Sequence, residues 1–452
     1  MVRRAWIIAI LLAGPLSAQP LSLGIDEVVA RAMQQYPSVR VSQAQVDAAT
    51  AGIALARTAY LPKVDAAAGI NRATRNNVFG LLLPSQVIAP ISGPVLGTND
   101  FTTVWSSTAG VLITWEPLDL GLRQANVDVA TASRERARAG IARTQLDVAT
   151  MAAEAYLTLL AAEETERAAQ AGVTRSETVQ KIVGALVRAE LRPGAEESRI
   201  KAETAAAQNQ VIQDRQAAAL ARATLAQLLG LPAVANLQPK PLGGKPGVPA
   251  SAALAGNPLL LEQNAAILEV QAREKALDKS YVPRFLLQGA AYGRGSGART
   301  DGSIGGFASG LAPNYQNWAI GFTVNWSLFE LPAIRARKEI EKAHERTERA
   351  RYELVVRELN GQLLKAQATL TAAQQLAANA PVELEAARAA NTQALARYQA
   401  GLSSIVDVAD TQRALTQAEI DQGLAQLGVW RALLGIAIVQ GNLQPFLQQV
   451  KE

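Results

Sequence analysis

The chain has 452 residues, of which 49% are hydrophobic, 18% charged and only 5% aromatic, with one histidine and no cysteine. The absence of cysteine excludes disulfides, thiolate metal sites, cysteine nucleophiles and a lipid anchor on an N-terminal cysteine. The single histidine, His344, excludes a metal centre with several histidine ligands. A formal net charge of +5 is too balanced to argue for a nucleic-acid partner.

The first 18 residues have the pattern of a secretory signal peptide. Arg3 and Arg4 precede an apolar run from Trp6 to Ala13, and a small-residue cleavage site ends at Ala18. A membrane anchor is the alternative, but the run is far shorter than the ~20 residues that a spanning helix needs. No later apolar run of that length is uninterrupted, so we expect no membrane-spanning helix in the exported protein.

The exported chain contains an internal repeat. Tyr60–Pro62 recurs as Tyr281–Pro283 with an offset of 221, whereas Ile113–Trp115 recurs as Val324–Trp326 with an offset of 211. We expect this single change of ten residues to lie in a surface loop. The predicted organisation is a signal peptide over 1–18, repeat 1 over 19–230, a Pro/Gly-rich linker over 231–250, repeat 2 over 251–441 and a C-terminal tail over 442–452.

Each repeat predicts a helix followed by a strand, a loop and a strand, at about 62–115 and about 283–328. Residues 318–328 alternate strictly between large apolar and small or polar side chains, and residues 105–115 repeat the pattern more weakly. The loops, 72–103 and 295–317, are rich in Gly, Pro, Asn and Ser. The apolar face would meet either a second sheet in a soluble sandwich or lipid around an outer-membrane barrel.

Four tryptophans favour the membrane interpretation. Trp318 and Trp326 are eight residues apart, roughly 27 Å along a strand, and strand tilt reduces this to about 20 Å of depth, close to the apolar band of such barrels. Four strands cannot close a barrel and open edges are not tolerated in lipid, so this interpretation requires an oligomer. The predicted membrane-interface aromatics are Trp105, Trp115, Trp318 and Trp326.

Long helices follow the strands. Residues 122–189 and 331–400 each predict a helix of roughly 100 Å, a length typical of coiled-coil arms, with return helices over 195–229 and 404–440. Gly401 supplies a left-handed helix stop. Asp407 and Asp410, three residues apart, share a face of the second return helix. The alternative is that they are ordinary acidic residues at a helix N-terminus.

The motif Tyr398-x-x-Gly401-x-x-x-Ile405-Val406-Asp407-x-x-Asp410 and the duplicated plan resemble the TolC-type outer-membrane efflux proteins over nearly the whole mature chain. The resemblance implies a mixed α/β membrane protein. It would be a homotrimer whose twelve-stranded barrel, four strands per chain, continues into a twelve-helix periplasmic tunnel with a small equatorial belt. The implied partners are a periplasmic adaptor, an inner-membrane pump and outer-membrane lipid.

The resemblance also implies the functional residues. It places a gated, cation-attracting periplasmic aperture at Asp407, Asp410, Glu196 and Tyr398. It places adaptor docking at the helix tips, formed by Glu190, Leu191, Arg192, Pro193, Gly194, Gly401, Leu402 and Ser403. Glu190 stands where the family usually has glycine, so we expect Pro193-Gly194 to make that turn differently or later. Ser403 replaces an arginine that some members use in the gate.

We therefore expect an outer-membrane exit duct of a tripartite efflux system that conducts small molecules passively, with no cofactor, no metal and no enzymatic activity. A type I protein-secretion duct is one alternative. A periplasmic coiled-coil adaptor or structural protein is another, although it would need no strands with one apolar face. A secreted enzyme is a third, but the sequence offers no nucleophile–base set, phosphate loop or ligand cluster.

Overall fold

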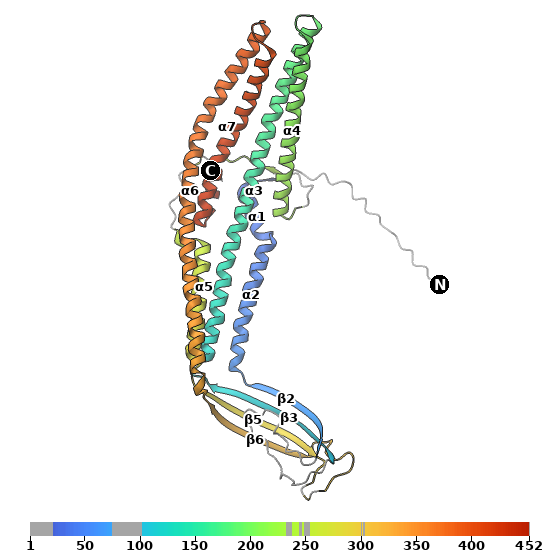
Figure 1. Ribbon diagram of the computed structural model, residues 1–452, viewed down its shortest axis with the longest axis vertical. Coiled ribbons are helices and arrows are strands. Elements are labelled where there is room, and N and C mark those ends of the chain that lie inside the picture. The colour runs from blue at the N-terminus through green and yellow to red at the C-terminus, as the bar shows by residue number, and fades with distance from the viewer. Residues whose placement is uncertain are drawn as a thin grey trace, which may run out of the picture. The chain divides into compact units, whose positions relative to one another are not determined.

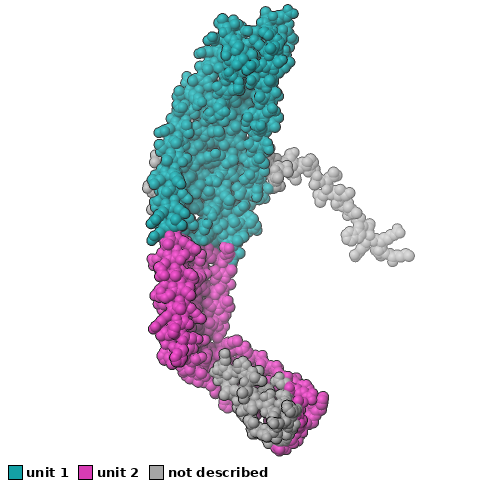
Figure 2. All heavy atoms as spheres, in the orientation of Figure 1, with its two compact units in different colours: residues 1–44, 138–262, 352–452 teal, residues 45–137, 263–351 magenta. Residues whose placement is uncertain are grey.

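The computed structural model describes residues 21–74, 102–231, 237–243, 246–247, 254–299, 301 and 303–451. The expected signal peptide, most of the loop over 72–103 and half of the linker over 231–250 lie outside the described residues. The chain divides into two compact units (Figure 2). Unit 1 comprises residues 1–44, 138–262 and 352–452, and unit 2 comprises residues 45–137 and 263–351.

Unit 2 contains an antiparallel four-stranded sheet (Figure 1) in the order β2-β3-β5-β6. Its strands are β2 (Lys63–Thr74), β3 (Thr103–Leu118), β5 (Arg284–Ser296) and β6 (Tyr315–Asn325). The adjoining helices are α2 (Pro37–Arg57), α3 (Leu122–Arg188), α5 (Pro258–Lys279) and α6 (Leu331–Gln399). Because the register pairs Lys63 with Thr114 and Arg284 with Asn325, all four strand–helix junctions lie at one end of the sheet.

The last strand is shorter than the alternation in the sequence predicted. β6 ends at Asn325 rather than near Leu328, and Leu328–Glu330 forms a 3-10 turn, η3. The register explains the difference, because Asn325 pairs with Arg284, the first residue of β5. Pro283 precedes it and has no backbone N–H to extend the ladder.

The two faces of this sheet differ sharply. The register aligns Val111, Ala291 and Trp318 on one face, which is apolar over most of the length of the four strands. Its large side chains are exposed, with Trp318 at 80% and Phe322 at 62%. No other described sheet covers this face, so the soluble sandwich that the sequence allowed is not what the described residues form. The exposed members are Val64, Ile70, Val111, Ile113, Trp115, Trp318, Ile320, Phe322 and Val324.

The element boundaries follow the repeat. α2 and α5 begin at Pro37 and Pro258, 221 residues apart. The return helices α4 (Gly194–Leu228) and α7 (Ile405–Gln440) begin 211 residues apart. Residues 75–102 connect β2 to β3 and residues 297–314 connect β5 to β6, so the first connection is ten residues longer. The prediction that the offset changes in these loops is confirmed.

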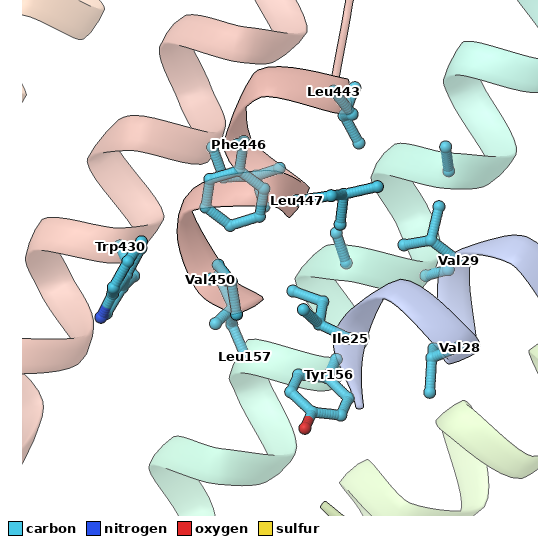
Figure 3. Packing of buried hydrophobic residues seen from close by; sticks show 14 of the residues in the cluster. Ile25, Val28, Val29, Tyr156, Leu157, Trp430, Leu443, Phe446, Leu447 and Val450 are labelled. Carbon is cyan, nitrogen blue, oxygen red and sulfur yellow. The ribbon is translucent and has the colours of Figure 1, made fainter. Parts of the chain in front are cut away.

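Unit 1 has its own hydrophobic core. It joins α1 (Ile25–Gln35), the middle of α3, the end of α7 and the C-terminal helix α8 (Gln444–Lys451). Figure 3 shows Phe446, Leu447 and Val450 of α8 among the side chains of this cluster. Trp430 meets Phe446 edge-on at 6.1 Å between ring centroids. The residues expected as a C-terminal tail therefore include a helix packed into the core.

A short parallel sheet also belongs to unit 1. β1 (Leu21–Leu23) pairs with β4 (Leu237–Pro239), which lies in the segment expected as a linker. The buried Tyr156 lies beneath it, with its hydroxyl 3.1 Å from the carbonyl oxygen of Leu23 and 2.6 Å from that of Lys240. The hydroxyl therefore anchors both segments to α3.

Among the described residues, α7 is the one helix long and apolar enough to cross a membrane. Arg431 interrupts its apolar run, so the sequence contained no uninterrupted segment of that length. In the structure Trp430, Leu434 and Ile436 of this helix are buried in the core of unit 1. Packing against α1, α3 and α8 therefore accounts for the apolar composition of α7.

A matched pair of glycines tests the sheet. At Gly110 a Cβ atom would lie 2.3 Å from the Tyr292 Cβ and 2.7 Å from the Ala291 carbonyl oxygen, whereas at Gly289 it would meet nothing within 4 Å. We expect Gly110→Ala to destabilise the sheet by about 1–3 kcal/mol and Gly289→Ala to have little effect. The measurement is unfolding by urea in detergent, and the readout is the heat-modifiable mobility of the protein on a gel. Equal midpoints for the two variants would contradict the register.

Candidate functional site

The turn between α6 and α7 has the geometry of a Schellman motif. The Leu402 N–H donates to the Arg397 carbonyl at 2.8 Å, and the Gly401 N–H donates to that of Tyr398 at 3.0 Å. Gly401 has a φ of 79°, in the left-handed region that glycine adopts without strain. The helix therefore stops where the sequence placed its stop.

The turn between α3 and α4 repeats this geometry without a glycine. The Leu191 N–H donates to the Leu186 carbonyl at 2.9 Å and the Glu190 N–H to that of Val187 at 3.0 Å. Glu190, 211 residues before Gly401, adopts a φ of 60°. The expectation that Pro193-Gly194 makes this turn was wrong. Glu190 accepts the left-handed conformation, and Pro193 is the N-cap of α4, which begins at Gly194.

Both tips present an apolar side chain to solvent. Leu191 is 69% exposed and Leu402 is 70% exposed, at equivalent positions of the two repeats. Figure 1 shows the two turns at the same end of their helices. Each tip thus combines a rigid hydrogen-bonded turn with one projecting leucine.

A buried tyrosine links the two hairpins of unit 1. Tyr398 is fully buried near the end of α6, and its hydroxyl donates to Glu196 Oε2 of α4 at 2.7 Å. Burial and the acceptor carboxylate raise the pKa of Tyr398 to about 12. The phenol therefore stays protonated at neutral pH. The stability that it contributes is fully present below its usual pKa of about 10 and is lost as pH rises through 12.

Arg192 completes this contact, which we name the tip clasp (Arg192, Glu196 and Tyr398). Its guanidinium donates to the Tyr398 carbonyl at 2.8 Å, lies 4.7 Å from the centroid of the tyrosine ring and approaches Glu196 at 3.9 Å. The sequence assigned Arg192 only to the docking tip. The signal in the sequence for a contact between Arg192 and Glu196 was their spacing of four residues. Arg192 is also the repeat equivalent of Ser403, the position at which the family resemblance implies a gate arginine in some members.

The tip clasp rests on a small apolar cluster. Val183 of α3, Ile200 of α4, and Ile405 and Val408 of α7 are all at most 3% exposed and pack with Tyr398. All four helices of the two hairpins therefore meet here. The separation of the hairpins at the tips would break one apolar cluster and three polar contacts.

The structure places Asp407 and Asp410 on an exposed part of α7. The Asp407 carboxylate accepts from the Ser404 N–H at 3.1 Å, and the Asp407 N–H donates to Ser404 Oγ at 3.4 Å, forming a capping box. Asp410 pairs with Arg413, one helical turn later. Asp407 thus has the helix-start role that the alternative interpretation assigned to it. Across the described residues, no group of three or more carboxylate or imidazole side chains is arranged to hold a metal ion.

The four tryptophans share the apolar side of the sheet or its margin. Trp115 donates its indole N–H to the Tyr60 carbonyl at 3.1 Å, next to the helices. Trp326 follows β6 and packs edge-on against Tyr281 at 6.0 Å. At the opposite end of β3, Trp105 lies 5.4 Å from the guanidinium of Arg72. The remaining member, Trp318, is exposed within β6.

An uncovered apolar sheet joined to long paired helices is the architecture of an outer-membrane channel. The chain belongs to the outer membrane efflux protein family, whose model matches residues 28–231 and 250–441. This confirms the family resemblance and the fold class that the sequence predicted. A search of curated protein sequences finds no match to the chain.

Solved outer-membrane channels share the fold. The chain is similar to the channel OprN, with 22% identity, a TM-score of 0.75, and 92% of this chain and 90% of that chain covered. The channel CmeC of Campylobacter jejuni is 14% identical, with a TM-score of 0.73, and 92% of this chain and 85% of that chain are covered. The channel MtrE of Neisseria gonorrhoeae, solved in an open state, is 18% identical, with a TM-score of 0.67, and 92% of this chain and 89% of that chain are covered.

Glu190 permits a test of the duplicated turn. Glu190→Gly keeps the left-handed conformation and removes the cost of about 1 kcal/mol that it imposes on a non-glycine residue, and the mirror change Gly401→Glu introduces that cost. At position 401 a Cβ would meet nothing nearer than 3.8 Å, so backbone strain alone is varied. We expect hydrogen exchange at the first tip to slow about five-fold in Glu190→Gly and exchange at the second tip to accelerate in Gly401→Glu. Changes of the same sign in both variants would disprove the equivalence of the turns.

Proposed function

We propose that this protein is the outer-membrane exit duct of a tripartite efflux system, assembled as a homotrimer. The single observation that carries the proposal is a four-stranded sheet with one exposed apolar face and two open edges. In lipid each unpaired N–H and C=O group of an edge costs several kcal/mol, so the edges must pair with other chains.

The order of the strands supports ring closure. The edge strands β2 and β6 run in opposite directions, because the four strands alternate in the order β2-β3-β5-β6. The β6 edge of one copy can therefore pair antiparallel with the β2 edge of the next, and every copy makes the same contact. Such head-to-tail contacts form a closed ring. Three copies supply the twelve strands that the family resemblance implies.

The helices would form the periplasmic part of the duct. In this arrangement the strand–helix junctions face the periplasm, and the connections over 75–102 and 297–314 face outward. The signal peptide expected over 1–18 would deliver the chain to the periplasm. Leu191 and Leu402 at the tips would meet the periplasmic adaptor, which connects the duct to an inner-membrane pump. The energy for transport would come from the pump, because the duct performs no chemical step.

The tips would also form the gate. Three copies would gather the exposed carboxylates of Asp407 and Asp410 at one narrow opening, where crowded like charges attract cations. The tip clasp would hold this opening closed, because it joins the two hairpins of each chain next to the tips. The relative MtrE has been solved in an open state, which supports the idea of a duct with more than one aperture width.

The carboxylates of α7 give the first functional test. Asp407→Asn with Asp410→Asn should leave trimer assembly intact, lower the cation selectivity of single channels in planar bilayers and remove block by trivalent cations from the helix side. Loss of the negative charge of Asp407 close to the helix N-terminus should cost about 0.3–1 kcal/mol of helix stability. Asp421→Asn, on the same helix and bonded only to Gln417 among the described contacts, is the control. If the double variant matches this control in selectivity and block, the two aspartates serve only the helix start.

The tip clasp gives the second test. Arg192→Ala removes the hydrogen bond to the Tyr398 carbonyl, the contact with its ring and the ion pair with Glu196. We expect a wider resting aperture, seen as several-fold higher single-channel conductance. The control Arg199→Ala removes an exposed arginine from α4, the helix that follows the turn. A conductance in Arg192→Ala equal to that of the control would show that the clasp does not hold the gate.

A further inference from the structure

The polar face of the sheet carries five charged residues, and four of them neutralise each other. Lys63 lies 3.4 Å from Asp65, and Arg284 lies 2.8 Å from Glu116. Both pairs are at the end of the sheet that joins the helices. The fifth, Arg294, is exposed near the other end of β5 and makes no hydrogen bond or ion pair with any described residue.

The position of Arg294 is defined by the register. It pairs with Thr108 of β3 and with Tyr315 of β6, so its side chain shares their face, opposite to the apolar face. Ten residues separate it from Arg284, roughly 33 Å along the strand. Arg294 therefore lies far from the compensated charges, toward the connections over 75–102 and 297–314.

Two aromatic residues flank this arginine. Tyr292 precedes it by two residues on the same face, and Tyr315 is its cross-strand partner and is 64% exposed. They are the only aromatic side chains on the polar face of the four described strands. Gly110 lies opposite Tyr292 and leaves room for it, because a Cβ at Gly110 would come within 2.3 Å of the Tyr292 Cβ.

We propose that Arg294, Tyr292 and Tyr315 form an anion-selective ring in the barrel lumen that favours aromatic carboxylates. The inference rests on the proposed function, because ring closure turns the polar face inward and brings three copies of Arg294 to one level. An uncompensated guanidinium attracts anions and binds carboxylates with two parallel hydrogen bonds. Tyrosine rings beside it offer stacking surfaces for a planar cargo. The duct would then prefer organic anions at its outer end, whatever the charge of its periplasmic opening.

The experiment measures reversal potentials of single channels in planar bilayers. The background is Asp407→Asn with Asp410→Asn, which removes the carboxylates proposed for the opposite opening. Arg294→Gln should lower the permeability of chloride, acetate and benzoate relative to potassium at least two-fold, and Arg294→Glu should lower it further. The matched control is Arg72→Gln, which removes an arginine from the apolar side of the same sheet. Tyr315→Ser should lower the permeability ratio of benzoate to acetate and leave that of chloride to potassium unchanged.

The outcomes separate this inference from the function on which it rests. A conducting parent channel whose reversal potential is the same in Arg294→Gln and Arg72→Gln would overturn the anion ring and leave the duct intact. An unchanged benzoate-to-acetate ratio in Tyr315→Ser would overturn the preference for aromatic anions. Failure of the parent protein to conduct in any lipid would instead overturn the proposed duct, and this inference with it.

Discussion

The main physical constraint on this molecule is the hydrogen-bonding capacity of two strand edges. β2 and β6 each present a row of backbone donors and acceptors beside a face of exposed tryptophan, isoleucine and phenylalanine. In water the backbone groups of the edges could form hydrogen bonds with solvent, but exposure of the apolar face would be unfavourable. In lipid the apolar face would be stable, but the backbone groups of the edges would have no hydrogen-bond partners. Pairing with further copies in a membrane resolves both costs together, which is why the sheet defines the class of protein before any individual residue does.

The helical part solves a different problem. Helices as long as α3 and α6 need partners along their whole length, and their burial is shared among several small clusters rather than one thick core. The largest cluster contains residues of α1, α8, the middle of α3 and the end of α7. Among its aromatic side chains, Trp430 and Phe446 pack against each other. At the tips, burial is reduced to a few aliphatic side chains around Tyr398. This cluster is small beside the core of unit 1, so few buried contacts join the four helices at their tips.

The two repeats show how a duplicated sequence can diverge while its geometry is kept. Glu190 and Gly401 adopt the same left-handed conformation and the same pair of terminal hydrogen bonds, although only one is glycine. Arg192 and Ser403 occupy equivalent positions, yet only Arg192 reaches across to the other hairpin. The divergence places the cation of the tip clasp in the first repeat and the pair of exposed aspartates in the second. Each chain thus presents two unlike tips.

The sequence by itself determined the repeat, the alternating faces of the strands, the long helices and the positions of their stops, because each depends on a local period or on a single turn residue. It could not reveal that Glu190 would accept a left-handed conformation, because that depends on the hydrogen bonds of the completed turn. Nor could it show that β1 pairs with β4, that α8 enters the core or that Arg192 meets Tyr398, because these contacts join residues far apart in the chain. Those features were decided by tertiary packing, since only the folded chain determines which distant groups share a buried contact.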